Sequence, residues 1–98
     1  MAWRIVVYPE SDLDIQAATV WYEDQQSGVG TQFLDELDLV LQRISENPLQ
    51  FPRLELEVRR ALLRRFPYGV YFLAEAEEVR ILAVLHLHRQ PDMWKTRP

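Results

Sequence analysis

The chain has 98 residues, of which 48% are apolar, and it contains no cysteine. This length suits one domain with its own core, so we expect a single domain over residues 1–98. Without cysteine there is no disulfide framework and no thiolate metal site. No apolar run reaches the length that spans a membrane, and the N-terminus lacks the pattern of a signal peptide. Together these absences favour a cytoplasmic protein.

The net charge of −4 is divided unevenly along the chain. Residues 1–50 carry 9 acidic and 2 basic side chains, which gives −7, whereas residues 51–98 carry 6 acidic and 9 basic side chains, which gives +3. The negative total argues against non-specific binding of nucleic acid. The basic half still allows a local phosphate site, and the acidic half could equally bind a basic segment of another protein.

The first expected element is a strand over residues 3–8, where β-branched and aromatic side chains precede Pro9. Ser11 and Asp14 then form a capping-box-like pair, which predicts a helix from about Ser11 to Gln26. Apolar residues recur along this helix at helical spacing, namely Leu13, Ala17, Val20 and Trp21.

A glycine-containing break at residues 27–30 separates this helix from the next, and Gly28 is expected to adopt the left-handed conformation. From Phe33 onwards the periodicity is the clearest in the sequence, and it predicts a helix that ends at about Glu46, before Asn47 and Pro48. One face is apolar, whereas the other carries Asp35, Glu36, Asp38, Gln42 and Arg43. Two amphipathic helices joined by a short turn imply an antiparallel helical hairpin.

After a loop at residues 48–52, the pattern is typical of three strands, at about residues 57–65, 70–74 and 79–88. The last of them is apolar on both faces, which predicts an interior position in the sheet. The tail from residue 90 is expected to be irregular or to form a short turn. The order β-α-α-β-β-β predicts an α+β fold, in which a helical hairpin packs on a small, mainly antiparallel sheet.

An arginine cluster is the first group of candidate functional residues, and it consists of Arg59, Arg60, Arg64 and Arg65. Guanidinium groups bind phosphate through paired hydrogen bonds and could stabilise the charge that develops during RNA cleavage. The alternative interpretation is a solvated strand face whose arginines pair with nearby acids. We expect these arginines to contact a partner.

Two histidines, His86 and His88, are expected on one face of the last strand. A histidine near its normal pKa can act as a general acid or base. A His-x-His pair can also bind a metal ion, but no third ligand lies at a suitable spacing, so neither a metal nor a cofactor is expected. If the protein is a nuclease, the catalytic candidates are therefore Arg65, His86, His88 and Arg89. The alternative is that at least one histidine only forms a hydrogen bond at the end of the strand.

Trp94 differs from the other aromatic residues because it lies in the irregular tail, so Trp94 and Lys95 are candidate anchors for a partner. Aromatic residues at the other positions are typical of a core, although their rings could stack on bases. The acidic side chains of the helical hairpin are typical of a solvated helix face. The sharper hypothesis is that they border a groove that receives a partner helix.

Several segments resemble, in their order and spacing, the RelE/ParE superfamily of bacterial toxins. They are Asp12-Leu13, Trp21-Tyr22-Glu23, Gly28-Val29-Gly30 with Phe33-Leu34, and Asn47-Pro48, followed by residues 64–71 and 83–91 with Trp94. The match extends over nearly the whole chain. This resemblance implies the toxin of a type II toxin–antitoxin pair, which is neutralised by a protein antitoxin whose C-terminal segment folds onto it.

Members of the superfamily differ in their target. RelE-like members cut mRNA on the ribosome, whereas ParE-like members inhibit DNA gyrase and are not enzymes. The sequence is more similar to the ParE-like branch and to plasmid-stabilisation proteins, since RelE-like sites are rich in lysine and arginine and the only lysine here is Lys95. The resemblance therefore implies DNA gyrase as the target. Ribosome-dependent, metal-independent cleavage of mRNA is the alternative, and a non-toxic member that only binds its antitoxin is a further one.

Overall fold

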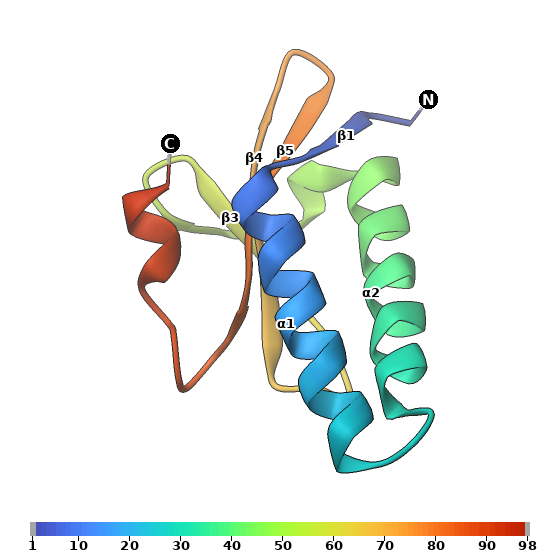
Figure 1. Cartoon of the computed structure of the whole chain (residues 1–98). Coiled ribbons are helices and arrows are strands. Elements are labelled where there is room, and N and C mark those ends of the chain that lie inside the picture. Colours follow the sequence, from blue (N-terminus) through green and yellow to red (C-terminus); the bar gives the residue numbers. More distant parts are fainter. Residues whose placement is uncertain (1, 98) are drawn as a thin grey trace.

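Two helices pack on a five-stranded sheet in the computed structural model, which describes residues 2–97 (Figure 1). The helices are α1 (Pro9–Gln25) and α2 (Val29–Glu46), and short 3₁₀ turns lie at Pro48–Gln50 and Met93–Thr96. The strands are β1 (Arg4–Val7), β2 (Arg53–Glu55), β3 (Val58–Leu62), β4 (Tyr68–Glu75) and β5 (Glu78–His86). The predicted α+β fold is therefore confirmed, with β2 as an unexpected fifth strand.

The strands lie in the order β1-β5-β4-β3-β2, and only the β1–β5 pair is parallel. This confirms the interior position predicted for β5. The sequence does not signal β2 because the strand has three residues and all of them are exposed. Within residues 2–97, no helix is both long enough and apolar enough to cross a membrane.

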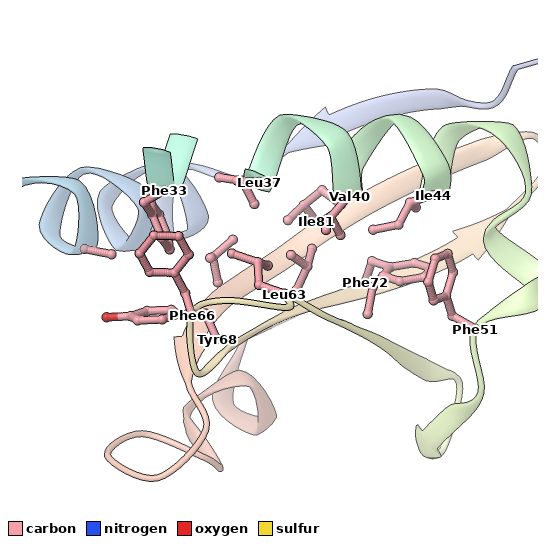
Figure 2. Close-up of a cluster of buried hydrophobic side chains, with 14 of the residues drawn as sticks. Phe33, Leu37, Val40, Ile44, Phe51, Leu63, Phe66, Tyr68, Phe72 and Ile81 are labelled. Atoms are coloured by element: carbon pink, nitrogen blue, oxygen red, sulfur yellow. The ribbon is translucent and has the colours of Figure 1, made fainter. Parts of the chain in front are cut away.

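The main core lies between the helices and the sheet (Figure 2). From α2, the buried side chains of Phe33, Leu37, Val40 and Ile44 point toward the sheet, so the face predicted for this helix is confirmed. Gly28 adopts the left-handed conformation at φ 93°, also as predicted, and the chain can reverse between the two helices there.

A second, smaller cluster covers the opposite face of the sheet. Its strand residues are Val58, Tyr71, Leu82, Ala83 and Leu85, and Trp94 from the C-terminal turn packs on them. The ring of Trp94 stacks on that of Tyr71 with the centroids 5.7 Å apart. The expectation that Trp94 is a surface anchor is therefore wrong, because the C-terminal turn brings its side chain into this cluster.

A β-bulge in β5 changes which of its apolar residues face each of the two clusters. Tyr71 lies opposite Ala83 and Phe72 lies opposite Ile81, so Leu82 is the extra residue. Ile81 belongs to the core beneath the helices, and Leu82 belongs to the cluster beneath Trp94. The extra residue shifts the alternation of side chains by one, so the two faces cannot be read from a simple period of two.

Ser11 and Asp14 bind this irregular part of β5 instead of capping α1. The Ser11 hydroxyl donates to the backbone oxygen of Ile81 at 2.8 Å, and Asp14 Oδ2 accepts a hydrogen bond from the backbone N–H of Val84 at 3.0 Å. The capping-box prediction is therefore wrong. The helix begins earlier, at Pro9, because proline suits the first turn of a helix and both polar side chains are used in tertiary contacts.

The apolar spacing in α1 does not mark its buried face. Leu13, Val20 and Trp21 expose 63%, 59% and 44% of their surface, whereas the buried residues of α1 are Ser11 and Ala18. The helix is attached to the sheet partly through the polar contacts of Ser11 and Asp14, which turn its apolar residues outward.

Candidate functional site

The turn after β5 brings together three of the residues that the sequence nominated. His86 is the last residue of β5, and its Nδ1 accepts hydrogen bonds from the backbone N–H groups of His88 at 3.1 Å and Arg89 at 3.2 Å. The two imidazole rings lie 5.8 Å apart. The prediction that both histidines share a strand face is wrong, because the chain turns directly after His86. The rings nevertheless lie close together.

These hydrogen bonds restrict what His86 can do chemically. Because its Nδ1 accepts two N–H groups, the ring is neutral and carries its proton on Nε2. Burial and the nearby Arg89 and His88 lower the pKa of His86 below its ordinary value, which also favours the neutral form. The ring can donate its Nε2 proton to an acceptor. It cannot accept a proton at Nδ1 without losing the hydrogen bonds that form the turn.

A hollow of about 370 Å³ opens beside this turn, along the part of β5 that extends beyond β1. One wall consists of residues of α1, and the other walls consist of Tyr68, Val84, His86, Arg89 and Gln90. The guanidinium group of Arg89 lies 5.1 Å from the ring centroid of Trp21, which is a cation–π contact. Burial raises the pKa of Tyr68, so its hydroxyl remains protonated at neutral pH. The hollow thus combines an apolar wall with several hydrogen-bond donors.

Arg97 completes the polar contacts next to this hollow. Its guanidinium group forms a two-pronged ion pair with the carboxylate of Asp14, with 3.1 Å between Nη2 and Oδ1, and it donates to the backbone oxygen of Leu82 at 3.1 Å. The negative charge of Asp14 is therefore already compensated. Arg89 remains as the charged group of the hollow without an ion-pair partner among residues 2–97.

Arg65, the fourth catalytic candidate, does not line this hollow. Its Nε donates to Glu36 Oε1 at 3.1 Å, and the backbone N–H groups of Arg64 and Arg65 also donate to the Glu36 carboxylate. Burial alone would raise the pKa of Glu36, but the hydrogen bonds from Arg65 and Arg64 lower it. The prediction that Glu36 lies on a solvated face is therefore wrong. The predicted strand also ends at Leu62, because this carboxylate holds the next residues in a loop.

The other three arginines of the cluster lie at two places, Arg59 beside the loop before β2 and Arg60 and Arg64 at a second surface. Arg59 donates to the backbone oxygen of Phe51 at 2.6 Å, so it stabilises the loop before β2. Arg60 lines a second hollow of about 300 Å³, and Arg64 lines a third of about 370 Å³. Arg43 lines both hollows, so they adjoin each other.

These two adjoining hollows form a basic surface that we call the arginine hollows. Their arginines are Arg43, Arg53, Arg60 and Arg64, and exposed leucines together with the carboxylates of Glu36 and Glu46 also line these hollows. Sequence reasoning missed Arg43 and Arg53 because they come from α2 and β2 and meet Arg60 only in the folded chain. Lys95, another predicted partner contact, forms ion pairs with Glu55 at 3.3 Å and Asp92 at 3.4 Å. Within residues 2–97, no three potential ligands from His, Cys, Asp or Glu are grouped so that they could hold a metal ion.

Comparison with known proteins identifies the fold. No family model matches the sequence, and no match was found among curated proteins. Among solved structures, a chain of the chromosomal ParDE TA system from P. aeruginosa superimposes with a TM-score of 0.77 at 17% identity, over 87% of this chain and 96% of that chain. The chain has the RelE/ParE fold. The RelE/ParE resemblance of the sequence is thus confirmed at the level of the fold.

A second solved structure has the same RelE/ParE fold. It is the toxin–antitoxin complex RelBE2 from Mycobacterium tuberculosis, with a TM-score of 0.62 at 15% identity over 88% of this chain and 99% of that chain. Both matches extend over nearly the full length of the matched chains.

Proposed function

We propose that this protein is the toxin of a type II toxin–antitoxin pair, that it acts in the cytoplasm, and that a protein antitoxin neutralises it. The fold carries the proposal, because both solved structures are toxin–antitoxin systems and the matches cover 96% and 99% of their chains. The arginine hollows and the hollow beside His86 support it, since both are concave surfaces on which a partner segment can bind.

We further propose that the target is DNA gyrase and that the protein inhibits it by binding, not by a reaction. The ParDE structure superimposes with the higher TM-score of the two, 0.77 against 0.62. The geometry at His86 supports binding, because Nδ1 is occupied by the turn and Arg65 is paired with Glu36 outside the hollow. A general base with its acceptor nitrogen occupied is poorly suited to proton transfer.

Ribosome-dependent cleavage of mRNA is the second candidate. The observation in its favour is that Tyr68, His86 and Arg89 surround one hollow, where they could donate hydrogen bonds to a phosphate. If the protein is a nuclease, His86→Ala and Arg89→Ala should each abolish RNA cleavage and toxicity together. A protein that only binds its antitoxin without being toxic is the third candidate.

The deciding experiment is pulse labelling after the chain is expressed without its antitoxin in bacterial cells. We expect DNA synthesis to fall before protein synthesis, and purified chain to inhibit supercoiling by gyrase. Co-expression of its protein antitoxin should restore growth. An earlier fall in protein synthesis would favour the nuclease, and unchanged growth with an intact complex would favour the non-toxic form.

A further inference from the structure

The turn after β5 depends on the protonation state of a single side chain. His86 Nδ1 accepts the backbone N–H groups of His88 at 3.1 Å and Arg89 at 3.2 Å. Among residues 2–97, neither of these N–H groups has another hydrogen-bond partner. Both bonds need the lone pair of Nδ1, so they exist only while the ring is neutral.

A proton on Nδ1 converts this acceptor into a donor. In the imidazolium ion both ring nitrogens carry hydrogen, so a flip of the ring does not restore an acceptor. The new N–H group would face the two backbone N–H groups that Nδ1 had accepted. The charged ring is therefore incompatible with the turn as it stands, and protonation requires the turn to change.

The residues on either side of the centre of this turn are held by other atoms. The N–H of Leu87 donates to the backbone oxygen of Pro67 at 2.9 Å, and the N–H of Gln90 donates to the backbone oxygen of His86 at 3.2 Å. Neither bond involves the imidazole ring. Protonation of the ring therefore frees the two residues between these anchors and leaves β5 in place.

Arg89 connects the freed segment to the hollow beside the turn. Its guanidinium group lies 5.1 Å from the ring centroid of Trp21 on α1, and both residues line the hollow of about 370 Å³. Arg89 has no ion-pair partner in the described part of the chain. Its position is thus determined by the cation–π contact and by the path of its own backbone. A movement of that backbone changes both the charge and the shape of the hollow.

The charged and titratable groups around His86 come from its own turn, from β4, from α1 and from the C-terminal tail. They are His88, Arg89, Tyr68, Asp14 and Arg97. The charge of Asp14 is compensated by Arg97, and Tyr68 stays neutral because burial raises its pKa. None of these groups supplies a free negative charge to the ring. Burial, Arg89 and His88 lower the pKa of His86, so the ring takes up a proton only in acid.

We propose that His86 is a proton-operated switch of this turn. A proton from solvent on the ring breaks both hydrogen bonds to the turn, frees the backbone of His88 and Arg89, and withdraws the guanidinium group of Arg89 from Trp21. The hollow then loses its unpaired cation, and the change reverses when the proton leaves. The inference follows from this turn alone and does not depend on the proposed function.

NMR of the intact protein measures each step of the switch. Nitrogen chemical shifts of the imidazole identify its tautomer, amide exchange measures the protection of the backbone, and nuclear Overhauser effects report contact between Arg89 and Trp21. At neutral pH we expect the Nε2–H tautomer of His86, protected amides at residues 88 and 89, and cross-peaks between Arg89 and the indole of Trp21.

Acid should change these signals together. We expect the protection of both amides to fall about tenfold, as for the loss of one hydrogen bond each, and the cross-peaks between Arg89 and Trp21 to disappear. Both changes should have the midpoint of the His86 titration, which lies below the ordinary histidine pKa. The amide of Leu87, which donates to Pro67, should keep its protection and serves as the internal control.

Asparagine substitutions at the two histidines provide a matched pair of variants. In His86→Asn the side-chain oxygen takes the place of Nδ1 as an acceptor and does not take up a proton in this range, so both amides should stay protected in acid. In His88→Asn the bonds to His86 Nδ1 are kept, since they involve the backbone. The response should persist there with a higher midpoint, because one of the groups that lower the pKa of His86 is gone.

Several results would overturn the proposal. They are a proton on Nδ1 of His86 at neutral pH, protection of residues 88 and 89 that survives charging of the ring, and a contact between Arg89 and Trp21 that persists in acid. A response that remains in His86→Asn and disappears in His88→Asn would assign the proton to the other histidine and refute the switch as well.

Discussion

Glu36 provides the sharpest test of how the loop between β3 and β4 is held. Its side chain is 9% exposed and accepts hydrogen bonds from three donors, the backbone N–H groups of Arg64 and Arg65 and the Nε of Arg65. In Glu36→Gln the size is kept, but the charge and one acceptor oxygen are replaced by an NH₂ group that faces these donors. Hydrogen bonds to a charged group contribute about 1.5–3 kcal/mol each, so we expect a loss of about 3 kcal/mol in the free energy of unfolding.

The pH dependence adds an independent check on the sign of this effect. The pKa of Glu36 is lowered in the folded state, because the donors from Arg65 and Arg64 outweigh the opposing effect of burial. A carboxyl group with a lowered folded pKa stabilises the protein above its unfolded pKa, which is about 4.3, and this contribution is lost as the pH falls through the folded value. The difference in stability between wild type and Glu36→Gln should therefore be constant near neutral pH and shrink in acid.

Urea denaturation followed by circular dichroism, from neutral pH to about pH 3, measures both quantities. Glu46→Gln is the matched control, because Glu46 lies in the same helix and is exposed, so its stability should stay within about 0.5 kcal/mol of wild type. A loss below about 1 kcal/mol for Glu36→Gln, or a difference from wild type that does not depend on pH, would refute the role assigned to this carboxylate.

Three further predictions concern polar groups near the sheet. Asp14→Asn breaks the ion pair with Arg97, and the side chains of Asp14 and Arg97 are only 13% and 11% exposed. We therefore expect the free energy of unfolding to fall by about 3 kcal/mol. Faster hydrogen exchange at the Trp94 indole would report release of the tail. Tyr71→Phe removes a buried hydroxyl that has no hydrogen-bond partner, so urea melts should show a gain of about 1 kcal/mol. In an NMR titration the His86 ring should change charge below the ordinary histidine pKa. Because its folded pKa is lowered, its contribution to stability is lost as the pH falls from the unfolded toward the folded value.

The elements with strong local signals were predictable from sequence. α2 ends at Glu46 as expected because the apolar period and Asn47-Pro48 both indicate that boundary. The order of helices and strands, and hence the α+β fold, follows from similar signals. Strand β2 and the bulge at Leu82 were not predictable, because the first buries no side chain and the second depends on pairing with β4.

The candidate site was predictable only where its residues are neighbours in sequence. His86, His88 and Arg89 lie within one turn, so any conformation of that turn keeps them close. From the sequence, Arg65 was assigned to the same site only because a guanidinium group can stabilise negative charge. Its position depends on Glu36, a residue 29 positions away whose carboxylate no local pattern marks as buried.

The two helices distribute polar and apolar side chains in different ways. α2 places four large apolar side chains in the core, whereas α1 directs Ser11 and Asp14 toward β5 and leaves most of its large apolar side chains exposed. β1 pairs with β5 only as far as Ile81, so the backbone beyond that point needs polar partners from α1. Ser11 and Asp14 of α1 form these hydrogen bonds, and they fix the rotation of the helix about its axis. With the helix in this orientation, Leu13, Val20 and Trp21 lie on its exposed side.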